Sequence, residues 1–244
     1  RDEHVNRDDF SRFLVHLCRD YGGKTARKNL KWILRLKHIQ ARNPHCLFQH
    51  KIKGIGFSET LKRQFNTVCF TEAPLSQLRF LTRHIEGRRI QLKPFGLVFW
   101  KHNLLEAGAN PAVYISSQTD GLREFLLGEF SRHFEDLRLY RSFRKKYGEE
   151  ADSIICYYSL VNVISDRVDF SWEREWRHKG GLKFGFNQLV AIIVPDPETF
   201  RKEDREFFSP ARWKDISRIP LISPEWNYEQ LVEELTLRLW EAST

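Results

Sequence analysis

The segment Ser171-Trp172-Glu173-Arg174-Glu175-Trp176-Arg177 holds the densest group of side chains able to do chemistry. Its alternation of residue types predicts a strand near an edge or a cleft, in which residues two apart share a face. Glu173, Glu175 and Arg177 would then project together. Two adjacent carboxylates repel each other, so we expect a raised pKa on one of them unless Arg174 or Arg177 compensates its charge. A surface ladder of salt bridges is the ordinary interpretation of such a segment, but the flanking tryptophans favour a low-dielectric site.

Two other segments place polar side chains among apolar ones. His16 stands within the apolar run Phe13–Cys18, where a lone histidine is more often a core residue with a satisfied hydrogen bond than a ligand-binding group. In Cys69-Phe70-Thr71-Glu72-Ala73-Pro74 a strand carries polar side chains to its end. There Glu72, close to the start of a helix, suits the helix dipole. Spacing alone does not join either segment to the two carboxylates.

Several common chemistries lack their motif in this chain. There is no GxxxxGK[ST], GxGxxG or GxSxG sequence, which disfavours P-loop, Rossmann and hydrolase-elbow proteins. The four cysteines are widely spread beside apolar residues, as expected for buried free thiols in a reducing cytosol. No HxxxH or HExxH pair occurs, and we expect no metal site. The opening residues show no signal-peptide pattern, so the predicted location is the cytoplasm.

Composition and charge indicate a folded, basic chain. It has 244 residues, of which 41% are hydrophobic and 14% aromatic, enough for a proper core. No repeat or linker divides it, so we expect one domain over residues 1–244. The net charge of +8 favours a polyanionic partner. Basic residues cluster between Arg19 and Arg63, opposed only by Asp20 and Glu59, which predicts a phosphate-facing surface.

The expected elements alternate without strict βαβ order, which favours an α+β fold. Apolar spacing predicts helices over 25–37, 75–85, 122–147 with one break, and 227–240. Alternating or continuously apolar runs predict strands at 68–71, 95–100, 112–115, 154–163, 172–178 and 190–194. The run Phe13–Cys18 is either a strand or the end of a first helix.

The order of several motifs resembles the AbiGi family of bacterial abortive-infection, phage-resistance proteins. The motifs are Phe-Leu-Val-His (13–16), Val-Cys-Phe-Thr-Glu-Ala-Pro-Leu (68–75), Phe-Gly-Leu-Val-Phe-Trp-Lys (95–101) with Gly-Ala-Asn-Pro-Ala-Val-Tyr (108–114), and Glu-Arg-Glu-Trp-Arg (173–177). The resemblance spans roughly His16 to Val194. More distantly, the arrangement is similar to ADP-ribosyltransferases of the DarT and PARP-like type. In those proteins an early His, a middle aromatic or hydroxyl residue and a late Glu line an NAD cleft.

This resemblance implies a split mixed or antiparallel sheet with flanking helices, and NAD as substrate. It assigns His16 to the NAD ribose, Glu175 to the catalytic carboxylate and Glu173 to the proton acceptor, with Arg177 beside the cofactor. Phe70 or Thr71 occupies the middle position, where a Tyr or Ser is expected. For the ring that stacks on nicotinamide, the candidates are Tyr114, Tyr157 and Tyr158.

The acceptor of ADP-ribose is expected to be nucleic acid, with RNA preferred to DNA. Basic residues that suit a groove following the phosphate backbone are Lys24, Arg27, Lys28, Lys31 and Arg35, and Phe48, Phe57 and Phe65 could act as stacking platforms for bases. A toxin that defends against phage in this way implies a neutralising antitoxin protein. No metal and no membrane is implied.

Two other functions compete with this one. The first is a non-enzymatic, antitoxin-like regulator that binds nucleic acid or a toxin. The second is a metal-dependent nuclease using Asp169, Glu173 and Glu175. Against the nuclease stand the crowding tryptophans and the absence of a lysine two residues beyond the carboxylates.

Overall fold

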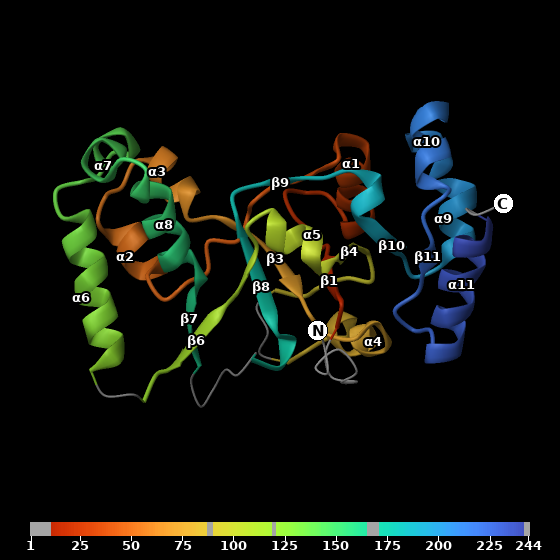
Figure 1. Cartoon of the computed structure of the whole chain (residues 1–244), viewed down its shortest axis with the longest axis horizontal. Coiled ribbons are helices and arrows are strands. Elements are labelled where there is room, and N and C mark those ends of the chain that lie inside the picture. Colours follow the sequence, from red (N-terminus) through yellow and green to blue (C-terminus); the bar gives the residue numbers. More distant parts are fainter. Residues whose placement is uncertain (1–10, 87–89, 119–120, 165–170, 242–244) are drawn as a thin grey trace. The chain divides into compact units, whose positions relative to one another are not determined.

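The computed structural model describes residues 11–86, 90–118, 121–164 and 171–241 (Figure 1). It is an α+β fold with a mixed parallel and antiparallel sheet and flanking helices, which confirms the predicted class. The chain forms two compact units. Unit 1 comprises Arg1–Ile39, Phe70–Glu106 and Lys183–Thr244, and unit 2 comprises Gln40–Cys69 and Ala107–Leu182. The prediction of a single domain stays a prediction.

Unit 1 is built on a sheet in the order β11-β10-β4-β1, followed by the last residues of β3. β1 pairs with β4 in antiparallel register, β10 is antiparallel to β4, and β10 is parallel to β11. The strands are β1 (Phe13–Leu17), β2 (His38–Ile39), β3 (Thr67–Thr71), β4 (Gly96–Trp100), β10 (Leu189–Ile193) and β11 (Leu221–Ile222). The helices are α1 (Ala26–Leu36), α4 (Leu78–Thr82), α5 (Lys101–Glu106), α9 (Pro197–Glu203), α10 (Pro210–Ile216) and α11 (Tyr228–Glu241). Phe13–Cys18 is therefore a strand.

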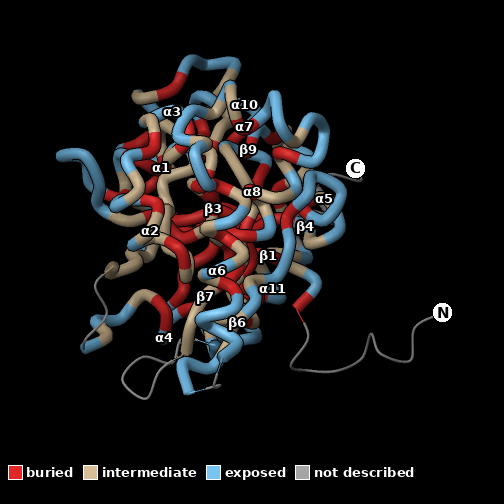
Figure 2. Tube along the Cα trace, turned by 90° about the vertical axis from the view of Figure 1, so that its left-hand side faces the viewer, coloured by how far each residue is buried: buried red, intermediate tan, exposed pale blue. Residues whose placement is uncertain are grey.

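One hydrophobic cluster of unit 1 lies on one face of this sheet, and Leu14 and Phe99 are fully buried on the other face. Val15 and Leu17 of β1, with Val98 of β4, are buried in this cluster. Figure 2 colours the buried stretches of the chain red. Leu78 and Leu231, from α4 and α11, pack on the same cluster. Alternate residues of β1 therefore face this core, and His16 points to the other face of the sheet.

Strands β1 and β4 approach closely at Gly96, which pairs with Leu17. A Cβ atom at position 96 would clash with the carbonyl oxygen of His16. Only glycine fits at this position without moving the β1 backbone.

Helix α1 forms as its sequence predicts. Thr25 caps its start, where its side chain accepts a hydrogen bond from the amide of Lys28 at 3.3 Å. Lys37 ends it in the left-handed conformation, with φ of 50°. Leu30 and Leu34 are fully buried, while the basic residues occupy the other faces. The predicted amphipathic helix over 25–37 is confirmed.

Unit 2 contains two strand pairings and a group of helices. Its part of the sheet runs from the first residues of β3 to β8 and then β5, and β6 pairs with β7 in parallel. The strands are β5 (Asn110–Pro111), β6 (Val113–Ser116), β7 (Val161–Ile164), β8 (Glu175–Lys179) and β9 (Leu182–Lys183), whose second residue already belongs to unit 1. The helices are α2 (Gln49–Gly54), α3 (Glu59–Gln64), α6 (Leu122–Phe134), α7 (Tyr140–Tyr147) and α8 (Glu150–Leu160). The expected break in 122–147 falls between α6 and α7.

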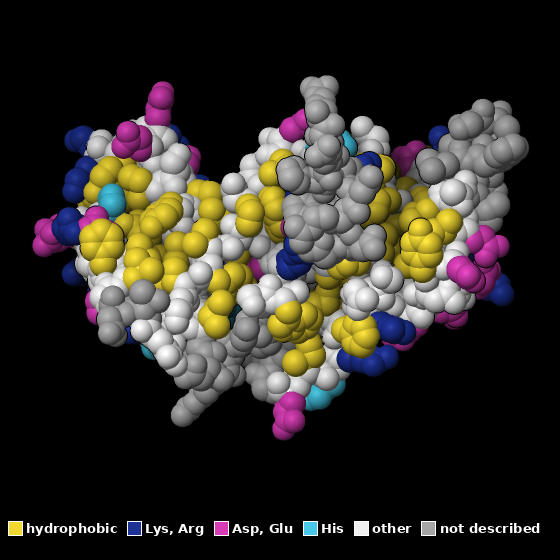
Figure 3. Space-filling model, turned by 60° about the horizontal axis from the view of Figure 1, so that its bottom comes forward, with side chains coloured by type: hydrophobic (Ala, Val, Ile, Leu, Met, Phe, Trp, Pro, Cys, Tyr) yellow, Lys and Arg dark blue, Asp and Glu magenta, His cyan; other side chains and the backbone are white. Residues whose placement is uncertain are grey.

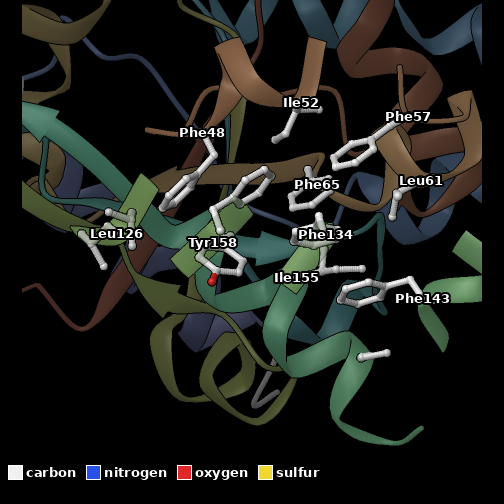
Figure 4. Close-up of a cluster of buried hydrophobic side chains, with 13 residues drawn as sticks. Phe48, Ile52, Phe57, Leu61, Phe65, Leu126, Phe134, Phe143, Ile155 and Tyr158 are labelled. Carbon is white, nitrogen blue, oxygen red and sulfur yellow. The ribbon is translucent and has the colours of Figure 1, made fainter. Parts of the chain in front are cut away.

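The core of unit 2 is rich in aromatic rings (Figure 4). Phe48 stacks on Phe130 with ring centroids 4.8 Å apart, and Phe65 packs against Phe134 at 5.5 Å. Phe48, Phe57 and Phe65 are 0%, 3% and 1% exposed. The interpretation of these three rings as stacking platforms for bases is therefore wrong, because they hold the core of unit 2 together.

The strand predicted over 154–163 is also wrong over most of its length. Residues 150–160 form helix α8, and only β7 follows as a strand. The buried residues of α8 are Ala151, Ile155, Tyr158 and Ser159, which recur at helical spacing. β-Branched and aromatic residues suggested a strand, but packing into the aromatic core decided the local structure.

Several large hydrophobic side chains stay at the surface, including Leu122 and Phe125 of α6 and Tyr157 of α8. Hydrophobic side chains gather on the left-hand part of the face seen in Figure 3. Within the described part of the chain, no helix combines the length and the apolar character needed to cross a membrane.

Candidate functional site

The candidate site begins at a sharp turn before β8. Ser171–Glu173 form a 3₁₀ turn, and the amide of Arg174 donates to the carbonyl of Ser171 at 3.0 Å. Arg174 then adopts a left-handed conformation with φ of 46°. This conformation costs roughly 1–2 kcal/mol for a residue other than glycine and is often found at functional sites.

The predicted strand over 172–178 therefore begins later, at Glu175. The prediction that Glu173, Glu175 and Arg177 share one strand face is wrong for Glu173, because the turn at Arg174 separates it from the strand. Glu175 and Arg177 do share a face of β8, as period-two spacing requires.

The Glu175 carboxylate and the Arg177 guanidinium form a buried ion pair. Nη2 of Arg177 donates to Oε2 of Glu175 at 2.9 Å, and Nη1 donates to the carbonyl of Ser159 at 2.7 Å. The Arg177 side chain is 1% exposed and that of Glu175 is 14% exposed. The arginine is thus fixed in the interior, while the carboxylate keeps a small opening to the surface.

Tyr114 and Cys69 complete the surroundings of this carboxylate. The amide of Ala112 donates to the carbonyl of Glu175 at 2.9 Å, which brings β6 past the start of β8. Two residues later, the hydroxyl of Tyr114 donates to Oε2 of Glu175 at 2.9 Å. Cys69 of β3 also hydrogen-bonds to Glu175, and its sulfur accepts a hydrogen bond from Nδ2 of Asn43 at 2.7 Å.

The electrostatics of this group keep Glu175 ionised. Burial would raise the pKa of Glu175, but the charge and hydrogen bond of Arg177, with hydrogen bonds from Cys69 and Tyr114, outweigh it and hold the pKa below its usual value. Burial, followed by the charge of Glu175, raises the pKa of Tyr114 well above its usual range. The same two causes raise the pKa of Cys69 to about 12. One carboxylate therefore stays charged beside a neutral tyrosine and a neutral thiol.

His16, which is expected to bind the NAD ribose, and the middle-position candidates Phe70 and Thr71 lie in unit 1, whereas Glu175 lies in unit 2. The ring of His16 meets the edge of the Phe70 ring at a centroid distance of 5.9 Å. Phe70 is 3% exposed and also contacts Phe99, so its ring belongs to the core. Thr71 is buried, and its Oγ1 accepts a hydrogen bond from the amide of Ala73 at 3.2 Å. Of this group, His16 has the most open side chain.

The remaining candidate residues differ in burial and in the contacts they make. Tyr158 is 1% exposed and hydrogen-bonds to Nδ1 of His133 at 2.7 Å, so it belongs to the core of unit 2. Tyr157 is exposed on α8. Glu72 is buried in an ion pair with Lys101 at 2.6 Å, a structural contact within unit 1. Asp169, a candidate nuclease residue, lies outside the described residues.

The basic residues assigned to nucleic acid, which lie on α1 and just before it, fall into two groups. Arg27 and Lys31 form ion pairs with the buried carboxylate of Asp204, both at 2.8 Å, and Arg27 also contacts Glu203. Hydrogen bonds to Asp204 and Glu203 raise the pKa of Arg27. These two side chains connect α1 to the end of α9. The other group, Lys24, Lys28 and Arg35, is exposed.

The sequence did not predict the parts played by Cys69, Asn43 and Ser159. For Cys69 the sequence predicts only a buried free thiol, and the carbonyl of Ser159 is a backbone group that no motif can mark. The signal that was available is the Arg at position 177, two residues after a Glu on a strand. A buried arginine needs several acceptors, so further partners around it were to be expected.

Among the described residues, no group of three or more His, Cys, Asp or Glu side chains is placed to hold a metal ion. Comparison of the chain with protein-family models, with curated proteins and with solved structures found no match.

Proposed function

We propose that this protein is an NAD-dependent ADP-ribosyltransferase in which Glu175 is the catalytic carboxylate. The observation that carries the proposal is the charged Glu175 itself, fixed by Arg177 and Tyr114 and still partly open to the surface. It is also the residue that the sequence resemblance assigns to this role. The residue before it, Arg174, is held in a strained conformation, as residues at functional sites often are.

The proposed reaction breaks the bond between the nicotinamide nitrogen and C1′ of the ribose. Both electrons of this bond go to the nitrogen, so the pyridinium becomes neutral nicotinamide. The ribose passes through an oxocarbenium-like state, which a fixed anion stabilises. An acceptor atom then gives a lone pair to C1′ and loses its proton, for which Glu173 is the proposed base.

In this proposal the other residues position the cofactor and the catalytic carboxylate. His16 binds the ribose and orients it, Tyr114 stacks on nicotinamide or holds the carboxylate, and Arg177 keeps the carboxylate ionised. Phe70 and Thr71 support the strand that carries them. The proposed acceptor is nucleic acid, RNA before DNA, and the proposed setting is phage defence in a bacterial cytoplasm under control of a neutralising protein.

The test is release of nicotinamide from NAD, together with transfer of labelled ADP-ribose to RNA. We expect the wild-type chain to show both, and Glu175→Gln to lower both rates about a hundredfold or more. Glu150→Gln is the matched control, because it removes one exposed carboxylate from the same unit. Its rates should equal those of the wild type.

Two further measurements keep the test decisive if Glu175→Gln is unstable. Circular dichroism establishes whether that variant is folded. His16→Ala, in the other unit, leaves Glu175 unaltered and should weaken NAD binding. If wild-type protein releases no nicotinamide, or if folded Glu175→Gln keeps full activity, the proposal is wrong.

A further inference from the structure

One surface of unit 1 carries cations that lie over aromatic rings. Nζ of Lys24 is 5.2 Å from the centre of the Trp32 ring, and the guanidinium of Arg35 lies 5.1 Å from the same ring. Arg35 also lies 5.7 Å from the ring of Phe207, which meets Trp32 edge to face at 5.5 Å. These contacts join α1 to the 3₁₀ turn Arg205–Phe207.

A second ring of unit 1 has the same arrangement. The Phe186 ring has Lys37 at 5.8 Å and Arg212 at 5.3 Å. We call the set of these two groups the cation–ring surface; its rings are Trp32, Phe186 and Phe207, and its cations are Lys24, Arg35, Lys37 and Arg212. All seven residues belong to unit 1.

The charges of this surface are available to a ligand. Within the described part of the chain, none of its four cations forms an ion pair with a carboxylate, in contrast to Arg27 and Lys31. Lys24 and Arg35 are exposed, and the three rings are half-buried, which fixes their orientation. The surface thus combines free positive charge with immobile ring faces.

We propose that the cation–ring surface binds single-stranded nucleic acid. The cations contact phosphates, and unpaired bases stack on the rings or on the guanidinium planes of Arg35 and Arg212. Duplexes keep their bases stacked inside and can use only the charges. As the acceptor site of the proposed transferase, this surface rests on the proposed function, and it replaces the buried phenylalanines of unit 2 as the stacking platform.

The experiment is fluorescence anisotropy with labelled single-stranded RNA and DNA of about twelve nucleotides, a hairpin duplex and anionic vesicles, all without NAD. We expect both single strands to bind more tightly than the duplex. Lys24→Ala/Arg35→Ala should weaken single-strand binding about tenfold and lower the slope of log affinity against log salt by about 1.4. Arg141→Ala/Lys145→Ala removes two exposed charges from α7 and is the matched control.

Phe186→Leu separates stacking from charge. It should weaken single-strand binding several-fold and leave the salt slope unchanged, because it removes a ring and no cation. Equal losses in both double variants, no preference for single strands, or binding to vesicles alone would overturn the proposal. Nicotinamide release measured without nucleic acid distinguishes the two proposals. Release without single-strand binding would contradict only the proposal for this surface, and single-strand binding without release would contradict only the proposed transferase activity.

Discussion

Arg177 and Glu175 put a full positive and a full negative charge into the interior of unit 2. Such a pair stabilises a fold only when its remaining hydrogen-bonding groups are satisfied, because both charges lose their water. Here the carbonyl of Ser159 and the hydroxyl of Tyr114 supply two such bonds, while Nε of Arg177 is buried without a hydrogen-bond partner among the described residues. Removal of one partner should therefore strongly lower the free energy of unfolding, since the other charge then stays buried alone.

We predict that Arg177→Met lowers the free energy of unfolding by about 3–5 kcal/mol, and that Arg177→Met/Glu175→Gln recovers part of this loss. Lys179→Met is the control, because it breaks a more exposed pair with Asp152 and should cost about 1 kcal/mol or less. Urea unfolding of the wild type and these three variants measures these values. A double variant less stable than Arg177→Met would contradict the argument.

The pH dependence has a definite sign. Because the pKa of Glu175 lies below its usual value, the folded chain binds fewer protons at this group than the unfolded chain. The stabilisation is complete above the ordinary carboxyl pKa of about 4.3 and is lost as the pH falls through the folded value. The stability difference between wild type and Glu175→Gln should therefore shrink in acid.

At the scale of elements, Asp204 decides how α1 meets the end of α9. Its side chain is 2% exposed and forms ion pairs with Arg27 and Lys31, whereas Lys24 and Arg35 are exposed. The division of basic residues on α1 into structural and exposed ones follows from this single buried acid.

We predict that Asp204→Asn lowers the free energy of unfolding by about 3 kcal/mol, because two cations lose their buried partner. Glu203→Gln, whose side chain is 62% exposed, should cost less than about 1 kcal/mol. Thermal and urea unfolding compare the two. Equal effects at both positions would show that burial does not set the strength of this contact.

Local patterns predicted the elements whose structure depends on their own residues. Helix α1 has its cap, its apolar stripe and its end within 25–37, and β10 is a short apolar run stopped by Pro195. Helix α8 was not predicted, because the conformation of its aromatic and β-branched residues depends on packing. Tyr158 of α8 packs against Phe48 and Phe130, which are distant in the sequence. At the site, spacing predicted that Glu175 and Arg177 share a strand face, and it left Arg174 and Arg177 as alternative partners for a carboxylate. It could not predict the turn at Arg174 or the arrival of Tyr114 from another strand.

At the scale of the whole molecule, the chain passes repeatedly from one unit to the other. It crosses after Ile39, Cys69, Glu106 and Leu182, so neither unit is a continuous segment. The aromatic core of unit 2 joins side chains from both of its segments. Each unit is therefore complete only when distant parts of the chain are present.

We predict that a fragment of residues 107–182 does not fold alone. It lacks Phe48, Ile52, Phe57, Leu61 and Phe65, whose burial is worth about 10 kcal/mol in total, close to the whole stability of an ordinary domain. Far-UV circular dichroism measures its helix content, and addition of a peptide of residues 40–69 should increase it. Cooperative unfolding of the isolated fragment would contradict this expectation.

The reactivity of the Cys69 thiol can be used to detect a ligand at the neighbouring carboxylate of Glu175. Only the thiolate reacts with iodoacetamide, and a pKa of about 12 leaves almost none of it at neutral pH. The charge of Glu175 contributes to this high pKa. Substitution of Glu175 by an uncharged residue, or binding of a positively charged ligand beside it, should therefore change the pKa of the Cys69 thiol. The alkylation rate at this one atom would then register, in real time, whether a ligand has reached the carboxylate.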